Sequence, residues 1–168
     1  MRYTVIDSPL GELLVTGDAA GLTGLYLPTG KHPRSVQAGW SRDDAAFAEV
    51  RAQLAEYFAG TRRDFDLPLN AAGSAFQKRV WSALVAIPYG ETTSYGRIAA
   101  AVASPDAARA VGLANGQNPI SVVVPCHRVI GADGSLTGYG GGLDAKRWLL
   151  SHEASHAGLF AHPTAVRR

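Results

Sequence analysis

The spacing of apolar residues changes near Gly73, and this change limits what the chain can fold into. Before Gly73, short apolar runs alternate with turn residues, which predicts an antiparallel meander of strands. The three runs lie at residues 3–6, 13–16 and 22–27. After Gly73, apolar residues recur every three to four positions, which is typical of helices. We therefore predict an α+β fold, in which a small antiparallel sheet with a packed helix precedes a mostly helical part.

One helix and one further strand complete the first part. Residues 43–59 place five apolar side chains on one helical face, which we expect to pack on the sheet. These side chains are Phe47, Val50, Leu54, Tyr57 and Phe58. Phe65, Leu67 and Leu69 alternate with polar neighbours, which predicts one more strand. We assign an N-terminal domain at residues 1–72, a C-terminal domain at residues 73–155 and a tail at residues 156–168.

The C-terminal domain is predicted to begin and end with an amphipathic helix. Ser74 is a suitable N-cap for the first of them. Its buried stripe would comprise Phe76, Val80, Leu84 and Ile87. The last helix would run from Asp144, a natural cap, to about residue 154, and would bury Trp148, Leu149 and His152. A glycine-dense loop at residues 131–142 precedes it.

Two short helices between them have helix-turn-helix spacing. The first covers residues 95–102, and Ser104-Pro105-Asp106 opens the second, which runs to Asn115-Gly116. The second helix is thin, because Arg109 is its only long polar side chain among alanines and glycine. A major-groove reader normally carries several long hydrogen-bonding side chains. A thin helix suits either the minor groove of DNA or close packing against another helix, and the spacing leaves both open.

Composition narrows the class of protein. With 168 residues, 46% hydrophobic content and a formal net charge of +2, the chain is globular, and a nucleic-acid partner is permitted but not required. Cys126 is the only cysteine, so no internal disulfide forms and a reducing compartment fits. Asp7 and Pro9 follow Met1 too soon for a signal peptide, and no apolar run approaches the roughly 20 residues of a membrane span, so we expect a cytoplasmic protein with neither a signal peptide nor membrane contact. Its five scattered histidines lack zinc spacing, and we predict neither metal nor cofactor.

The lone cysteine lies between two strand-like apolar runs, Val122–Val124 and Val129-Ile130. A buried structural thiol is the ordinary interpretation of such a residue. Here the neighbours favour a nucleophile, because His127 can take a proton near neutral pH and Arg128 is too polar for unpaired core. A histidine base needs a carboxylate to fix its tautomer. Asp133, Asp144 and Glu153 are the candidates that follow it.

Pro125-Cys126-His127-Arg128-Val129 resembles the centre of the O6-alkylguanine-DNA alkyltransferase family. The flanking matches are Ile87-Pro88-Tyr89-Gly90-Glu91, Ser94-Tyr95, Ala107-Ala108-Arg109-Ala110-Val111-Gly112, Asn118-Pro119, Gly138-Tyr139-Gly-Gly-Gly-Leu143 and Leu149-Leu150-x-x-Glu153. The resemblance is dense over residues 74–154, whereas residues 1–70 match only as a pattern of strands and a helix. It implies an RNase H-like N-terminal domain and a winged-helix-like C-terminal domain with a helix-turn-helix.

The resemblance also implies a reaction. Cys126 would attack the alkyl carbon of O6-alkylguanine, or of O4-alkylthymine, and keep the group as a thioether in a single turnover. His127 would draw the thiol proton through a water, and Glu153 would orient that histidine. Tyr95 would polarise ring N3 of the leaving guanine. Asn118 would tie the helix pair to the active-site turn.

The implied partner is double-stranded DNA carrying O6-alkylguanine, bound by a monomer, with cooperative assembly on the DNA as a possibility. The carbonyls of Cys126 and Val129 would accept the exocyclic amine of the flipped base, and the loop at Tyr139-Gly140 would close over it. Arg109 would fill the gap in the base stack, in the minor groove. Ala108 and Gly112 would lie nearest the DNA, and Arg128 is also assigned to DNA binding.

Two departures from the family and three rival functions bear on this interpretation. Some relatives bind zinc in the N-terminal half through Cys and His, where this chain has only His32, so we predict no zinc. Gly140 stands where some relatives have serine, which removes a hydroxyl contact to O6. The rivals are a non-enzymatic alkyltransferase-like protein, a cysteine hydrolase using Cys126, His127 and Glu153, and a plain helix-turn-helix regulator. The first typically carries Trp in place of the cysteine.

Overall fold

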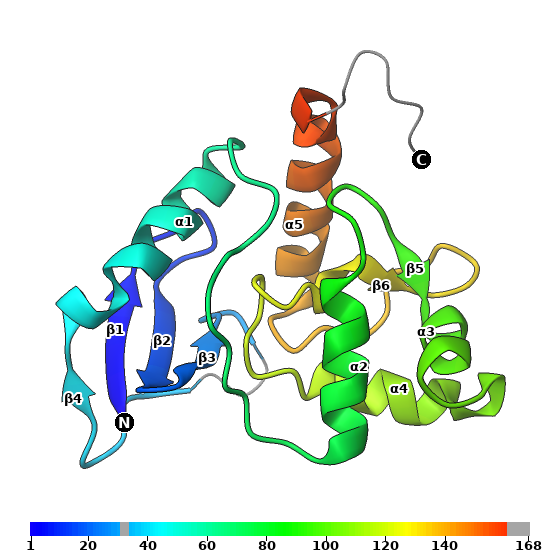
Figure 1. Cartoon of the computed structure of the whole chain (residues 1–168). Coiled ribbons are helices and arrows are strands. Elements are labelled where there is room, and N and C mark those ends of the chain that lie inside the picture. The colour runs from blue at the N-terminus through cyan, green and yellow to red at the C-terminus, as the bar shows by residue number, and fades with distance from the viewer. Residues whose placement is uncertain (31–33, 161–168) are drawn as a thin grey trace.

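The computed structural model describes residues 1–30 and 34–160, and its two halves lie side by side (Figure 1). The first half is a four-stranded sheet with the order β3-β2-β1-β4. The strands are β1 (Arg2–Ile6), β2 (Leu13–Asp18), β3 (Gly21–Tyr26) and β4 (Ser41–Arg42). The first three form the predicted antiparallel meander, while the two-residue β4 pairs parallel with β1 and was not predicted.

A helix covers this sheet, as predicted. Asp43 caps a 3₁₀ turn at Asp44–Phe47, which continues directly into α1 (Ala48–Phe58). Phe47, Val50, Leu54 and Tyr57 are buried, and Phe58 is half-buried. The spacing of these side chains therefore confirms the expected contact face.

The strand predicted around Phe65, Leu67 and Leu69 is wrong. This segment is extended, but a single bridge between Leu69 and Leu22 joins it to the edge of the sheet. Pro68 explains the interruption, because proline lacks the N–H that a ladder requires and can only accept, here from the Leu22 amide at 2.9 Å.

The second half contains α2 (Ala75–Val85), α3 (Tyr95–Val102), α4 (Ala108–Gly116) and α5 (Leu143–His156). Ser74 caps α2 through a reciprocal capping box with Gln77, which satisfies two amides of the first turn. A 3₁₀ turn at Pro105–Ala107 joins α3 to α4. Two short parallel strands, β5 (Thr93–Ser94) and β6 (Val129–Ile130), lie beside these helices. The helical prediction for this half is confirmed, and so is the α+β fold.

Three local expectations need correction. Asp144 does not cap α5: Gly142 occupies the N-cap and Asp144 lies in the first turn. The run Val122–Val124 is not a strand but a tight turn, in which Val122 has a φ of 71°. A β-branched residue in this left-handed region is strained by about 1–3 kcal/mol, so the surrounding packing must hold it there. The predicted tail begins inside ordered structure, because α5 extends to His156 and a 3₁₀ turn follows at Ala157–Phe160; residues 161–168 lie outside the described residues.

The chain just before the reactive cysteine is joined to the edge of the N-terminal sheet. Leu25 of β3 donates its amide to the Pro119 carbonyl at 2.8 Å and accepts from the Ser121 amide at 3.1 Å. Ile120, between them, is fully buried. The hydrophobic core is correspondingly continuous across both halves. The N-terminal sheet therefore fixes the start of the turn that carries Cys126.

Candidate active site

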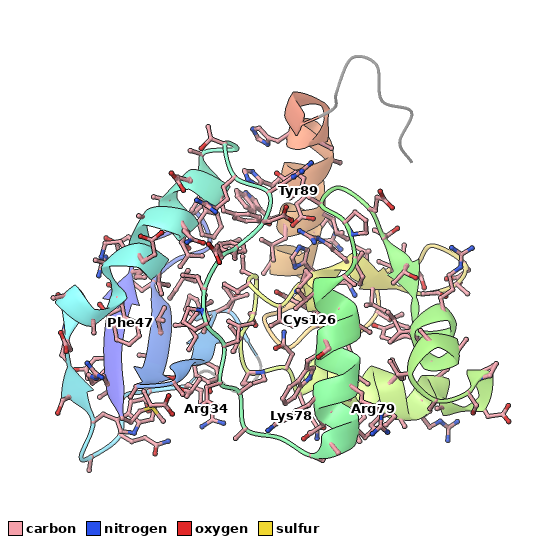
Figure 2. All side chains as sticks on the ribbon, in the orientation of Figure 1. Arg34, Phe47, Lys78, Arg79, Tyr89 and Cys126 are labelled. Carbon is pink, nitrogen blue, oxygen red and sulfur yellow. The ribbon has the colours of Figure 1, made fainter. Side chains whose placement is uncertain are left out.

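Cys126 begins a 3₁₀ turn, Cys126–Arg128, between the strained turn and β6. Figure 2 shows it near the centre of the molecule, between the two halves. It is 4% exposed and is a free thiol. The sequence places the cysteine here because Pro125 and the left-handed Val122 turn the chain twice within a few residues. A nucleophile in such a turn is held without depending on its own side-chain packing.

Two asparagine side chains fix the backbone of this turn. Asn118 donates from Nδ2 to the Val124 carbonyl at 2.9 Å, and its Oδ1 accepts from the Ile120 amide at 3.0 Å. Asn115 is buried and donates to the Cys126 carbonyl at 3.4 Å. In the sequence, Asn115 could be recognised only as a helix-ending residue. Its contact depends on α4 packing behind the turn, which no local pattern reveals.

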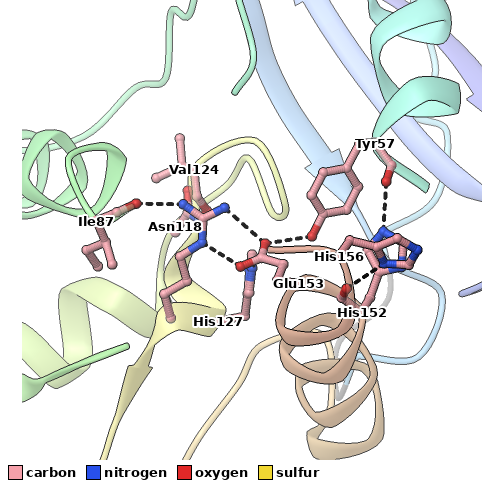
Figure 3. Close-up of polar contacts among 9 residues, drawn as sticks. Tyr57, Ile87, Asn118, Val124, His127, His152, Glu153 and His156 are labelled. Carbon is pink, nitrogen blue, oxygen red and sulfur yellow. Dashed lines mark hydrogen bonds and ion pairs between the residues drawn. The ribbon is translucent and has the colours of Figure 1, made fainter. Parts of the chain in front are cut away.

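Glu153, near the end of α5, accepts hydrogen bonds from three side chains at once (Figure 3). His127 Nε2 lies 2.7 Å from its Oε2, and the Tyr57 hydroxyl donates to the same oxygen at 2.7 Å. Arg128 donates from Nε to Oε1 at 2.7 Å and from Nη2 to Oε2 at 3.0 Å. His127 is 0% exposed and Glu153 1%. Of the three candidate acids, the structure thus places Glu153 on the histidine.

The charges of this cluster determine the histidine tautomer. Burial alone would raise the pKa of Glu153, but His127 and Arg128 together hold it well below its usual range, so the carboxylate is ionised. Burial lowers the pKa of His127, against the opposing effect of Glu153, so the imidazole is neutral. An ionised carboxylate can only accept, and Nε2 must therefore carry the proton. Nδ1 is left as the basic nitrogen, with no protein hydrogen-bond partner among the described residues.

The thiol of Cys126 is protonated at rest. Burial raises its pKa, while the Asn118 amide and the charge of Lys146 act in the opposite direction without overcoming it. A thiolate is the reactive form of cysteine. The neutral histidine that follows it in the chain is a candidate base for this thiol.

Lys146 is a functional candidate that the sequence interpretation missed. Its ammonium group is buried and donates to the carbonyls of Val129 at 2.7 Å and Thr137 at 2.8 Å. It thereby links β6 to the glycine-dense loop and places a positive charge near Cys126. Lys146, Leu149 and Glu153 share one face of α5 at spacings of three and four residues. That spacing was the available signal, because it puts the lysine on the buried stripe.

A groove of about 780 Å³ opens between α4 and the glycine-dense loop, and Tyr139, which lies against Cys126, is among its lining residues. Six residues predicted for base or DNA contact line it: Tyr95, Ala108, Arg109, Gly112, Tyr139 and Gly140. The Tyr95 hydroxyl donates to the Thr137 carbonyl at 3.1 Å, so it is engaged with the loop. Tyr139 is buried and lies against Cys126, and burial raises the pKa of its hydroxyl.

The structure contradicts a DNA contact for Arg128. Its guanidinium is buried between Glu153 and the Ile87 carbonyl, to which Nη1 donates at 2.6 Å. The sequence indicated that Arg128 is too polar for unpaired core, and its pair turns out to be internal, in Glu153. The Val129 carbonyl was expected to accept a hydrogen bond from the exocyclic amine of the flipped base. In the structure it already accepts one from Lys146.

Neither a metal centre nor a membrane span is visible in the described ranges. Within residues 1–30 and 34–160, no three His, Cys, Asp or Glu side chains gather so that they could hold a metal ion. His32 lies outside the described residues. In the same ranges, no helix is both long and apolar enough to cross a bilayer.

Comparison with known proteins defines the class. Residues 75–155 match the model of the 6-O-methylguanine DNA methyltransferase DNA-binding domain, and residues 1–71 match the ribonuclease-like domain of the same family. The chain therefore belongs to the 6-O-methylguanine DNA methyltransferase family, as the motifs around Cys126 predicted.

Individual relatives agree over nearly the whole length. The chain is 54% identical over 157 residues to the methylated-DNA–protein-cysteine methyltransferase of Mycolicibacterium paratuberculosis, covering 94% of each chain. It is 50% identical over 155 residues to the protein of that name from Methanosarcina acetivorans, covering 92% of this chain and 99% of the relative. The crystal structure of Mycobacterium tuberculosis OGT in complex with DNA superposes with a TM-score of 0.87 at 51% identity, covering 93% of this chain and 94% of the other.

Proposed function

We propose that this protein repairs DNA by transferring the alkyl group of O6-alkylguanine to Cys126. The observation that carries the proposal is the position of the thiol. It lies beside a neutral histidine whose Nδ1 is free to accept a proton, and against Tyr139, which lines the groove next to α4. The relatives named for this activity support the same assignment.

The reaction needs one proton transfer and one displacement. His127 Nδ1 takes the thiol proton, directly or through a water, and Glu153 stabilises the resulting imidazolium. The thiolate sulfur attacks the alkyl carbon, the bond between carbon and O6 breaks, and its electron pair stays on guanine. A proton from the Tyr95 hydroxyl neutralises the developing charge at ring N3, and Tyr95 recovers it as the imidazolium returns its own proton through solvent. The products are a thioether and normal guanine.

The thioether explains why the protein acts once. A neutral dialkyl sulfide offers water no easy displacement, so the sulfur keeps the alkyl group. We infer a single turnover, with O4-alkylthymine as a second substrate of the same chemistry and no cofactor. The protein is then a reagent consumed in proportion to the damage.

Minor-groove binding follows from the shape of α4. Ala108 and Gly112 place no more than a methyl group in the groove, and Arg109 is the exposed cation that lines it. A helix of this kind can approach the minor groove closely while the damaged base is flipped out of the stack, and Arg109 fills the gap left behind. Few cations face the DNA, so we expect a shallow salt dependence, because each phosphate contact adds about 0.9 to its slope. We propose that the protein binds DNA as a monomer, and this mode of binding is compatible with cooperative assembly along the DNA.

Intact mass spectrometry tests the proposed function. The protein is incubated with a duplex containing one O6-methylguanine, and its mass is followed against time. We expect one methyl group per protein, confined to the peptide that contains Cys126, and one repaired base per protein consumed. Repeated turnover would instead favour a hydrolase, and repaired DNA with an unmodified Cys126 would overturn the assignment.

Replacing Gly112 with glutamine should weaken DNA binding without damaging the fold. A Cβ at this position meets nothing closer than the Tyr95 ring at 3.8 Å, and glycine is the poorer helix former by about 1 kcal/mol. The long glutamine side chain would nonetheless keep α4 away from the floor of the DNA minor groove. We expect at least a tenfold rise in the dissociation constant for a methylated duplex, measured by fluorescence anisotropy.

The matched control is Val85→Gln, an exposed position on α2 away from the groove. It should change neither DNA affinity nor thermal stability. Unchanged affinity in the Gly112 variant would show that α4 is not the helix that approaches DNA.

A further inference from the structure

Tyr57 is the one member of the Glu153 cluster that comes from the N-terminal half. It lies on α1 and is fully buried, and its hydroxyl donates to Glu153 Oε2, the same oxygen that His127 Nε2 contacts. Burial, and next the charge of Glu153, raise the pKa of this phenol, so it remains a donor. Two hydrogen bonds through Glu153 Oε2 therefore connect the hydroxyl to His127 Nε2, on the other side of the imidazole ring from the basic Nδ1.

The main chain of Tyr57 is held as firmly as its side chain. His152 Nε2 lies 2.7 Å from the Tyr57 carbonyl, so two consecutive residues of α5 hold one residue of α1 (Figure 3). The ring packs edge-on against Phe58 and Tyr89 and tilted against Phe65. These contacts fix the direction of the hydroxyl without help from Glu153.

We propose that Tyr57 is a positioning residue for alkyl transfer, which keeps Glu153 on His127 Nε2 so that Nδ1 stays free to accept the thiol proton. This inference rests on the proposed function. Arg128 donates to both oxygens and so fixes the plane of the carboxylate, but its bond to Oε2, at 3.0 Å, is the longer of the two. The Tyr57 hydroxyl donates to Oε2 at 2.7 Å and holds in place the oxygen that His127 Nε2 also contacts.

The hydroxyl also adjusts how strongly Glu153 attracts a proton on His127. A hydrogen-bond donor spreads the negative charge of the carboxylate that it contacts. The carboxylate then stabilises a neighbouring cation less strongly. The charges of Arg128 and Lys146 also lower the pKa of His127. The other titratable groups around this cluster are Cys126, Tyr89 and Glu153. Removing the Tyr57 hydroxyl should therefore make His127 more basic and reduce its neutral fraction near pH 7.

The experiment compares wild-type protein with Tyr57→Phe, which keeps the ring contacts. We expect single-turnover methyl transfer at pH 7 to slow by about tenfold, a loss of roughly 1.4 kcal/mol in the activation free energy. The acidic limb of its pH profile should move to higher pH, while DNA affinity stays within about twofold. Tyr3→Phe, which removes a phenol hydroxyl from the sheet, should change none of these. An unchanged rate and pH profile in Tyr57→Phe would overturn the proposal.

A second measurement separates this inference from the proposed function, because it needs no DNA. Imidazole ¹⁵N spectra of the unreacted protein should show the His127 Nε2–H tautomer in the wild type and a raised His127 pKa in Tyr57→Phe. Site-specific 3-fluorotyrosine at position 57, an isosteric and stronger donor, should move that pKa downward. Shifts in these directions without methyl transfer by the wild type would support the positioning and sink the repair function. Identical His127 titration in all three proteins would sink the positioning alone.

Discussion

Replacing Cys126 with serine should abolish methyl transfer and leave DNA binding intact. A serine hydroxyl is a far weaker nucleophile at neutral pH, and a histidine whose own pKa is lowered by burial cannot supply the missing reactivity. Cys126 is 4% exposed and does not line the groove, so the DNA-facing surface is unchanged. We expect no adduct by intact mass after prolonged incubation, and a dissociation constant within about twofold of the wild type by anisotropy.

A relocated thiol provides the control for this variant. Ser151 is exposed on α5. Ser151→Cys in the Cys126→Ser background therefore supplies an exposed free cysteine that is not next to His127 in the chain. Reactivity toward the methylated duplex should not return. Transfer to residue 151 would mean that the damaged DNA alkylates any accessible thiol, and that the environment of Cys126 is not what selects it.

Replacing Glu153 with glutamine should lower the free energy of unfolding by about 3–5 kcal/mol, because the Arg128 charge would be left buried without its anion. That is a large part of the 5–15 kcal/mol typical of a folded domain. Chemical denaturation of purified protein measures it. Glu56→Gln, which breaks the half-exposed pair with Arg62, is the matched control and should cost less than about 1 kcal/mol. Equal losses in the two variants would contradict the buried ion pair.

The same variant changes how stability depends on pH. The pKa of Glu153 is depressed in the folded protein, so the unfolded chain takes up the proton first as the pH falls. Its contribution is fully present above its unfolded pKa of about 4.3 and is lost below it. The lowered pKa of His127 acts in the same sense from about pH 6.5 downward. The stability of the wild type should therefore fall in two pH ranges, below about 6.5 and below about 4.3. Glu153→Gln should not show the loss of stability in the lower range.

The sequence predicted the elements whose patterns are local. The meander, α1 and the helices after Ser74 follow from apolar spacing and capping residues, and these predictions are confirmed. The motif around Cys126 also predicted the family. Phe65 to Leu69 failed because strand spacing says nothing about whether a partner edge is available, and Pro68 interrupts the ladder.

What the sequence did not predict depends on contacts between distant segments. Tyr57 was expected only as part of a core stripe, and its hydroxyl reaches Glu153 because the C-terminal parts of α1 and α5 meet. Arg128 was expected at the DNA because its anion lies 25 residues further along the chain. The left-handed Val122 was hidden inside an apolar run of strand-forming residues. In each case the decisive partner comes from tertiary packing.

The hydrogen bond between Tyr57 and Glu153 joins residues 96 positions apart, and this distance affects when the protein becomes competent. Contacts of long sequence separation form late in folding, because loop closure must precede them. A growing polypeptide exposes Cys126 before α5 exists to orient its base. Under the proposed function, the thiol gains its oriented base only when α5 packs against α1, so we expect a partly folded molecule to leave Cys126 unalkylated.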